Sequence, residues 1–267
     1  MEIRRESIWN DVFETYLSVN FELVKHLKRR RLPIVAALAV IVPLIFYVKV
    51  PDTADVFAAT VLSFVNILIV VSAAMFAGDA VCGEFEKKTS LLLFPTPQRR
   101  STIFAGKYIA ALLATFLVVL LYYLTMTLQT AQLYGWGEIP AELGKSFLTA
   151  LIYSAAAVSV VYFFSALLKR PITSTIVGFL FLMMILQVVA MVLMLVDQEP
   201  WFIVTYSANL ITDVLGVSSS LPFGPEEEEH AWALKFSPDF GVGIAVMVAY
   251  AIVGFVTGMA IAVRKED

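Results

Sequence analysis

Six long apolar stretches constrain this chain more than any other feature. They cover residues 32–50, 56–77, 103–128, 144–168, 172–196 and 241–263. Such stretches predict membrane spans, because about 20 residues of α-helix cross a hydrocarbon core about 30 Å thick. The chain is 60% hydrophobic and 15% charged, whereas soluble domains are roughly half apolar and roughly a quarter charged. The sequence therefore predicts an all-α, multi-pass integral protein of the plasma membrane with six transmembrane helices.

The distribution of basic residues predicts the orientation of these spans. Six spans place both termini on the same side of the membrane. Of the 19 lysines and arginines, 16 fall on that side, and only Lys49, Lys145 and Lys235 fall on the other. Because basic residues accumulate in cytoplasmic loops, we expect both termini to be cytoplasmic. Residues 197–240, which are rich in acidic side chains, then form an extracytoplasmic connection.

The first 31 residues precede the first span and have a two-sided pattern. On a helical wheel, Trp9, Phe13 and Tyr16 share an apolar side, while Glu22 and His26 fall on the opposite one. This pattern is typical of an amphipathic helix that lies in the membrane interface. The sequence therefore divides into a cytoplasmic interfacial helix at 1–31 and a transmembrane domain at 32–267.

The extracytoplasmic connection 197–240 contains two short apolar segments, 201–204 and 209–215, which predict short interfacial helices. An acidic tract at 226–229 is followed by His230. Cation binding is one reading of that tract, but a run of like charges is more often solvated surface. Four methionines in the fifth span could contact a soft metal, but methionine in an apolar helix more often serves ordinary packing. We therefore expect no metal site.

Motifs for independent enzyme chemistry are missing from the sequence. It has no G-x-x-x-x-G-K-[ST] phosphate loop, no H-E-x-x-H motif and only one cysteine, Cys82. The two histidines, His26 and His230, fall on opposite sides of the predicted membrane. We therefore expect no catalytic site, no cofactor in this chain and no nucleic-acid partner.

Polar side chains within the apolar stretches are few, and they are candidates for function because they are costly in lipid. Asn66 in the second span and Gln187 in the fifth are the amides among them. We expect them to form hydrogen bonds between helices, with a role in lining a substrate path as the alternative. No charge falls in the middle of a span, which disfavours an ion-coupled carrier.

The stretch from Gly78 to Lys107 differs from the apolar sequence around it. It surrounds a short apolar core with charged residues. Thr89 can cap the start of a short helix, and Pro95 and Pro97 end it. Such a helix would present an apolar ridge to a groove in a soluble partner, within a polar rim. The residues predicted to dock are Glu84, Glu86, Thr89, Leu92, Leu93, Phe94, Pro97, Arg99 and Arg100.

This stretch resembles that of the ABC-2-type transporter permeases, the membrane subunits of ATP-driven exporters. The matching positions are Gly83-Glu84, Thr89, Leu92-Leu93-Phe94, Thr96-Pro97, Arg99-Arg100 and Gly106-Lys107. Two positions depart from the family pattern, Lys88 where glycine is usual and Leu91 where an acidic residue is usual. The resemblance implies a cytoplasmic coupling helix in region 78–102. It also implies a partner ATPase subunit that binds ATP and Mg²⁺, and a second permease copy or a paralogue.

These observations together predict a permease subunit that couples ATP hydrolysis by a separate ATPase to export of an amphipathic or lipid-like substrate. A first alternative is a mechanotransmitting subunit, which drives a conformational change in an extracytoplasmic partner bound at 197–240 without transport. A second alternative is an ATPase-independent scaffold or carrier. The sequence names no substrate and does not separate a homodimer from a heterodimer.

Overall fold

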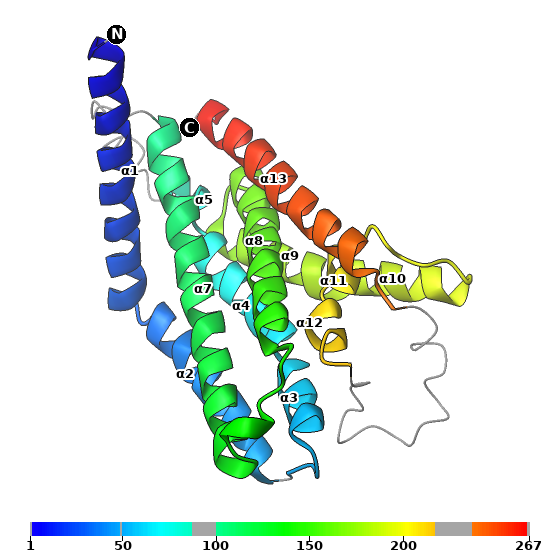
Figure 1. The fold of residues 1–267 in the computed structure, drawn as a ribbon. Helices are drawn as coiled ribbons and strands as arrows, with labels where there is room; N and C mark the ends of the chain where they lie inside the picture. Colours follow the sequence, from blue (N-terminus) through cyan, green and yellow to red (C-terminus); the bar gives the residue numbers. More distant parts are fainter. Residues whose placement is uncertain (1, 49, 87–99, 217–236, 266–267) are drawn as a thin grey trace.

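The computed structural model describes residues 2–48, 50–86, 100–216 and 237–265, and all regular secondary structure in these ranges is helical. Six segments there are long and apolar enough to span a membrane: Arg31–Val48, Ala54–Glu86, Arg100–Leu133, Leu143–Leu167, Pro171–Leu195 and Phe240–Arg264. This confirms the predicted fold class of an all-helical membrane protein. The two ends of the chain lie at the same end of the molecule (Figure 1), as an even number of spans requires.

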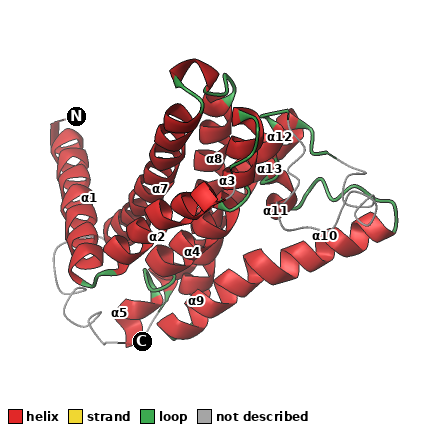
Figure 2. Cartoon of the chain, turned by 90° about the horizontal axis from the view of Figure 1, so that it is seen from below, coloured by secondary structure: helices red, strands yellow, loops and turns green. Residues whose placement is uncertain are grey.

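The longer helices are α1 (Glu2–Lys28), α2 (Arg31–Ile45), α7 (Arg100–Leu133), α8 (Leu143–Leu167) and α13 (Phe240–Arg264). The second span is divided into α3 (Ala54–Leu62), α4 (Val65–Ala77) and α5 (Cys82–Glu86), and the fifth into α9 (Pro171–Leu180), η3 (Phe181–Ile185) and α10 (Leu186–Leu195). The second, third and fourth spans supply most of the buried core, whereas the first, fifth and sixth are largely exposed. Figure 2 shows α9 and α10 along one edge of the bundle and α1 along the opposite edge.

The second span is interrupted, which its uniform hydrophobicity does not predict. Helix α3 ends at Leu62 and α4 begins at Val65. Close to this break, the buried hydroxyl of Tyr122 on α7 donates a hydrogen bond to the carbonyl of Val61 over 2.5 Å. Irregular backbone is tolerated at membrane depth where neighbouring helices satisfy its polar groups. Tyr122 provides such a partner here.

The span predicted at 103–128 ends too early, because α7 continues to Leu133. The reason is that the polar side chains at this end are buried in the bundle: Gln129 is 3% exposed and Thr130 is fully buried. The hydroxyl of Thr130 donates to the carbonyl of Met126. Gly135, just beyond the end of the helix, has φ of 99° and ψ of 160°, a backbone conformation that is essentially confined to glycine.

Two glycines allow α13 to cross close to α8. A Cβ atom at Gly254 would lie 2.9 Å from the backbone carbon of Ser159, and one at Gly258 would lie 2.8 Å from the ring of Tyr162. Their spacing of four residues places them on one side of α13. Small residues at such spacing let helices approach closely in lipid, where van der Waals packing replaces the hydrophobic driving force.

The beginning of the connection after the fifth span folds into the bundle. Helix α11 (Val204–Ser207) packs on α13, and α12 (Leu210–Asp213) packs on α8. The segments predicted to be short interfacial helices, 201–204 and 209–215, lie close to α11 and α12, and both helices are mostly buried against the bundle, which the sequence analysis did not predict. The hydroxyl of Ser146 on α8 donates to the carbonyl of Ile211 over 2.6 Å. Residues 217–236, which include the acidic tract, lie outside the described residues.

Candidate functional site: a buried charge network

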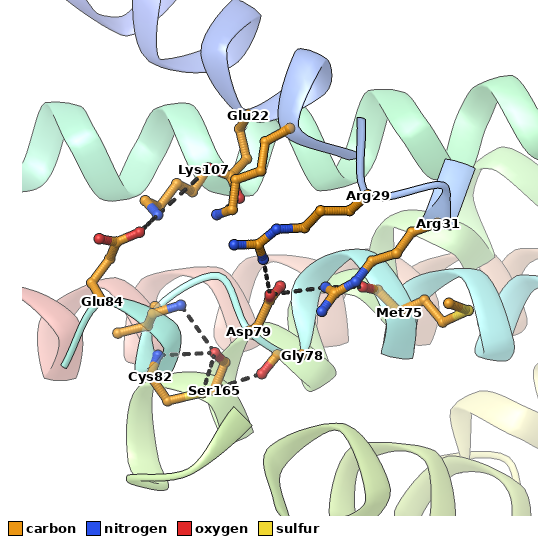
Figure 3. A network of polar contacts seen from close by, with 12 residues as sticks. Glu22, Arg29, Arg31, Met75, Gly78, Asp79, Cys82, Glu84, Lys107 and Ser165 are labelled. Carbon is orange, nitrogen blue, oxygen red and sulfur yellow. Dashed lines mark hydrogen bonds and ion pairs between the residues drawn. The ribbon is translucent and has the colours of Figure 1, made fainter. Parts of the chain in front are cut away.

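A group of charged side chains lies where α1, α2, α5, α7 and the turn after α4 meet (Figure 3). We call it the charge network, and its members are Glu22, Lys25, Arg29, Arg31, Asp79, Glu84 and Lys107. In the chain, Glu84 precedes and Lys107 follows the segment 87–99, which holds most of the predicted docking residues. The network therefore joins the two ends of that segment to the N-terminal helices.

Lys107, on the second turn of α7, is the centre of one half of the network. Its ammonium group forms an ion pair with Glu84 on α5, and its Nζ lies 3.6 Å from a carboxylate oxygen of Glu22 on α1. Glu22 is also paired with Lys25. Lys107 is 5% exposed and Glu22 is 2% exposed. Buried charges of this kind persist only when they are paired, so the three elements are held together by mutual neutralisation.

Asp79 is the centre of the other half of the charge network. Its Oδ2 atom lies 2.8 Å from a guanidinium nitrogen of Arg31 and 3.4 Å from one of Arg29. Arg31 also donates to the carbonyl of Met75 over 3.2 Å. Arg30, between these two arginines, has φ of 58°, a costly conformation for a residue with a side chain. The turn from α1 to α2 is thus anchored on the end of the second span by a carboxylate that is 5% exposed.

Helix α1 presents its polar side to the protein. A Cβ atom at Gly106 on α7 would lie 2.5 Å from Cβ of Ser18 and 3.2 Å from the carbonyl oxygen of Thr15, so a glycine is needed for this close approach. The apolar side chains Phe13, Tyr16 and Phe21 are more than 60% exposed. This is the arrangement that an amphipathic helix needs in order to contact lipid with its apolar face.

Helix α5 is positioned by residues that are distant in the sequence. The Ser165 hydroxyl on α8 accepts hydrogen bonds from the backbone amides of Val81 over 3.0 Å and Cys82 over 3.4 Å (Figure 3). Lys265, just after α13, donates to the last carbonyls of α8, those of Ala166 and Leu168. The Lys265 ammonium lies 5.2 Å from the ring centroid of Phe85 on α5. Movement of α5 would therefore displace residues that contact both α8 and α13.

His26 is buried inside this region, with 1% of its surface exposed, and neither ring nitrogen has a hydrogen-bond partner in the described structure. Its ring packs edge-on against Phe76 at a centroid distance of 5.2 Å. Burial lowers the pKa of His26 below its ordinary value of 6.5, and the neighbouring carboxylates of Glu22 and Asp79 only partly oppose this shift. His26 is therefore neutral at neutral pH.

The described structure covers three of the residues predicted to dock a partner. Glu84 is directed inward to Lys107, so it belongs to the charge network rather than to an exposed rim. Glu86 and Arg100 are exposed. The remaining predicted docking residues, Thr89, Leu92, Leu93, Phe94, Pro97 and Arg99, lie outside the described residues, and their role stays a prediction.

The two amides predicted within spans are not brought together by an observed hydrogen bond. Asn66 on α4 has a buried Oδ1 atom without a partner among the described residues. Gln187 lies on an exposed face of α10. Each amide therefore faces a different environment, and the alternative roles predicted for them, interhelical bonding or lining a path, stay open as predictions.

Sequence reasoning singled out Glu84 and Lys107 as motif positions but missed their pairing and the contributions of Glu22, Arg31 and Asp79. One available signal is the polar side of the amphipathic helix at 1–31, which carries Glu22, Lys25 and His26. A polar side facing water needs no partners, and the sequence does not reveal that this one is covered by α7. Only the packing of α1 shows that these charges are buried.

Comparison with known proteins identifies the class. The family model described as "ABC-2 family transporter protein" matches residues 7–258, which is nearly the whole chain and includes most of α1, the charge network, the first five candidate spans and most of the sixth. The chain therefore belongs to the ABC-2 transporter family of membrane proteins. A search of curated proteins found no match.

Proposed function

We propose that this protein is the membrane-spanning permease subunit of an ATP-binding-cassette exporter. A separate ATPase subunit, which binds ATP and Mg²⁺, docks on the region 84–100, and a second permease copy or a paralogue completes the transport pathway. The termini and the docking region are cytoplasmic, and α1 lies in the membrane interface. The observation that carries the proposal is the family match over residues 7–258 together with a charge network that joins both ends of the docking segment to α1 and α2.

The network supports a mechanical route from the ATPase into the spans. A push on the docking segment reaches α5 through Glu84 and α7 through Lys107, and these two residues are ion-paired. Helix α5 is in turn linked to α8 by Ser165. Packed helices respond to such loads by rigid-body shifts rather than by local bending. The apolar surfaces of the spans suit an amphipathic or lipid-like substrate.

Co-purification tests the docking step. The permease is purified from its own host cells, and the amount of ABC ATPase that co-purifies with wild type is compared with the amount that co-purifies with Leu93→Asp. Loss of the ATPase with Leu93→Asp is expected, whereas Trp136→Asp, at an exposed position near the other end of α7, should retain it. Equal retention by both variants, or no ATPase with wild type, would contradict docking and favour an ATPase-independent scaffold or carrier.

A second candidate is a mechanotransmitting subunit, and the burial of α11 and α12 favours it. These helices join the extracytoplasmic connection to α8 and α13. At the other end of α8 and α13, Lys265 connects the two helices and lies beside Phe85 of α5. Transport in proteoliposomes that contain the ATPase separates the two candidates. ATP-dependent movement of lipids or hydrophobic compounds supports export. ATP turnover that moves nothing, yet depends on residues 197–240, supports mechanotransmission.

A further inference from the structure

A pocket of about 330 Å³ lies between α11, the segment before it and the first turn of α13. It is at the opposite end of α13 from Lys265, about 37 Å along a helix of 25 residues. We call it the outer pocket, and its lining residues include Glu199, Trp201, Tyr206, Asp239 and Val242. Its volume is within the range of small-molecule sites.

The described lining of the outer pocket contains two carboxylates and no basic side chain. Among the described residues, its lining contains no lysine, arginine or histidine, and neither Glu199 nor Asp239 takes part in an ion pair. Asp239 accepts hydrogen bonds from the amides of Gly241 and Val242, both at its Oδ1 atom. Two carboxylates on one concave surface favour a cationic ligand, because their combined field is concentrated there.

One of these carboxylates is held in place by a buried neighbour. Tyr206 is 2% exposed, and its hydroxyl donates to Oε1 of Glu199 over 3.2 Å. Burial and the Glu199 charge raise the Tyr206 pKa, so this hydroxyl stays a neutral donor. Gly243 allows the wall to form, since a Cβ atom there would lie 2.4 Å from Leu210. The pocket is therefore a preorganised feature of the α11–α13 contact.

The remaining lining selects an organic cation over a metal ion. Trp201 and Tyr206 supply aromatic rings, whose faces attract ammonium groups. Val242 and the adjacent Phe240 supply exposed apolar surface. A calcium ion would need about six to eight oxygen ligands, and no group of three or more His, Cys, Asp or Glu side chains able to hold a metal exists among the described residues.

We propose that the outer pocket binds the ammonium or quaternary ammonium group of an amphiphile, with Glu199 and Asp239 neutralising the charge and Trp201 covering it. This inference rests on the proposed export function in one respect, since it names the polar group of the substrate. The binding itself needs neither ATP nor the ATPase, so it is measured on the permease alone. A failure of this binding would leave the docking test above unaffected.

The experiment is an isothermal titration calorimetry measurement. Hexyltrimethylammonium is titrated into the permease in phosphatidylglycerol nanodiscs, and the heat of binding is recorded. Hexyl sulfate and 1-heptanol serve as the anionic and neutral counterparts of similar length. We expect saturable binding of the cation only, about tenfold weaker in Glu199→Gln and in Asp239→Asn. Both changes keep the hydrogen-bond acceptors, and asparagine keeps the helix cap. Glu138→Gln, at an exposed carboxylate elsewhere, serves as the control and should bind as wild type does.

A second set of nanodiscs identifies the source of the cation. In phosphatidylcholine discs, loss of the hexyltrimethylammonium binding that depends on Glu199 and Asp239 would show that the lipid headgroup itself occupies the pocket, whereas persistence of that binding would point to a free organic cation. Either result supports the proposal. Three results would overturn it: binding of the neutral alcohol as tight as that of the cation, wild-type affinity for the cation in both Glu199→Gln and Asp239→Asn, or displacement of the cation by calcium at low millimolar concentration.

Discussion

Lys107 and Glu84 form an ion pair across the two ends of the segment that we propose to dock the ATPase. The pair is largely buried, and Glu22 of α1 approaches the same ammonium group. The segment 87–99, which we propose receives force from the ATPase, is therefore flanked on its two sides by residues that form an ion pair. The first three predictions concern this region, and the fourth concerns the packing of the sixth span.

Replacement of Lys107 by methionine is expected to destabilise the protein. It leaves Glu84 and Glu22 as buried carboxylates without their shared partner, which costs about 3 kcal/mol of unfolding free energy. Thermal unfolding in detergent, followed by tryptophan fluorescence, measures the change. The double variant Lys107→Met/Glu84→Gln should recover part of the loss, because it removes one of the two carboxylates that share Lys107.

Lys145→Met is the matched control for this change. The Lys145 side chain is 64% exposed, and its pair with Glu142 is in solvent, so its removal should alter stability by less than about 1 kcal/mol. Equal midpoints for the two lysine variants would show that the buried pair contributes no more than a surface pair.

Gly106→Leu should separate α1 from α7. Even a Cβ atom at this position would lie within 2.5 Å of Ser18, and the larger side chain forces α1 away. In a Cys82→Ser background, maleimide labelling of Ser18→Cys should then become several times faster. Gly137→Leu is the control, since nothing lies within 4 Å of its Cβ position. Unchanged labelling in Gly106→Leu would mean that α1 is not held at this glycine.

Acid should loosen the docking of α1 through His26. Its pKa is lowered in the docked state by burial, so the docked state binds fewer protons than the undocked state. Docking is then fully stabilised above the ordinary value of 6.5 and weakens as the pH falls below it. The groups facing His26 are Glu22 and Lys25 on its own helix, Asp79 after α4 and Arg31 on α2.

The measurement is the thermal midpoint of wild type and of His26→Leu between pH 7.5 and pH 5.5. Wild type should lose stability across this interval, and His26→Leu should lose less, because it has no proton to take up. The difference between the two proteins isolates the imidazole from the carboxylates nearby. Parallel curves would exclude His26 as the source of the pH dependence.

Gly254→Leu should disrupt the contact between the fourth and sixth spans. The added side chain meets the backbone of Ser159 on α8, which cannot yield as a flexible side chain would, so the cost is about 1–3 kcal/mol or more. The yield of monodisperse protein after solubilisation reports the effect. Val253→Leu, at the neighbouring and 61% exposed position, places the same leucine side chain toward lipid and should be tolerated. A normal yield for Gly254→Leu would argue against close packing at this crossing.

The number and place of the spans could be predicted because hydrophobicity is a property of about 20 consecutive residues. The break near Val61 could not be predicted, since it depends on a tyrosine from another helix. The motif of the ABC-2 family could be recognised from spacing. The inward direction of Glu84 could not, because the partner, Lys107, lies 23 positions away on a different helix.

By itself, the sequence determined that this chain is a six-span membrane protein with a charged segment between the second and third spans. Those features follow from local composition, because apolar segments partition into the lipid bilayer and charged segments stay outside it. Tertiary structure decided that Glu22, Asp79 and Lys107 are buried in a network of ion pairs and that α11 and α12 return into the bundle, where α11 lines the outer pocket. The physical reason is that the free energy of a charge depends on what surrounds it, and only the packing of distant helices creates those surroundings.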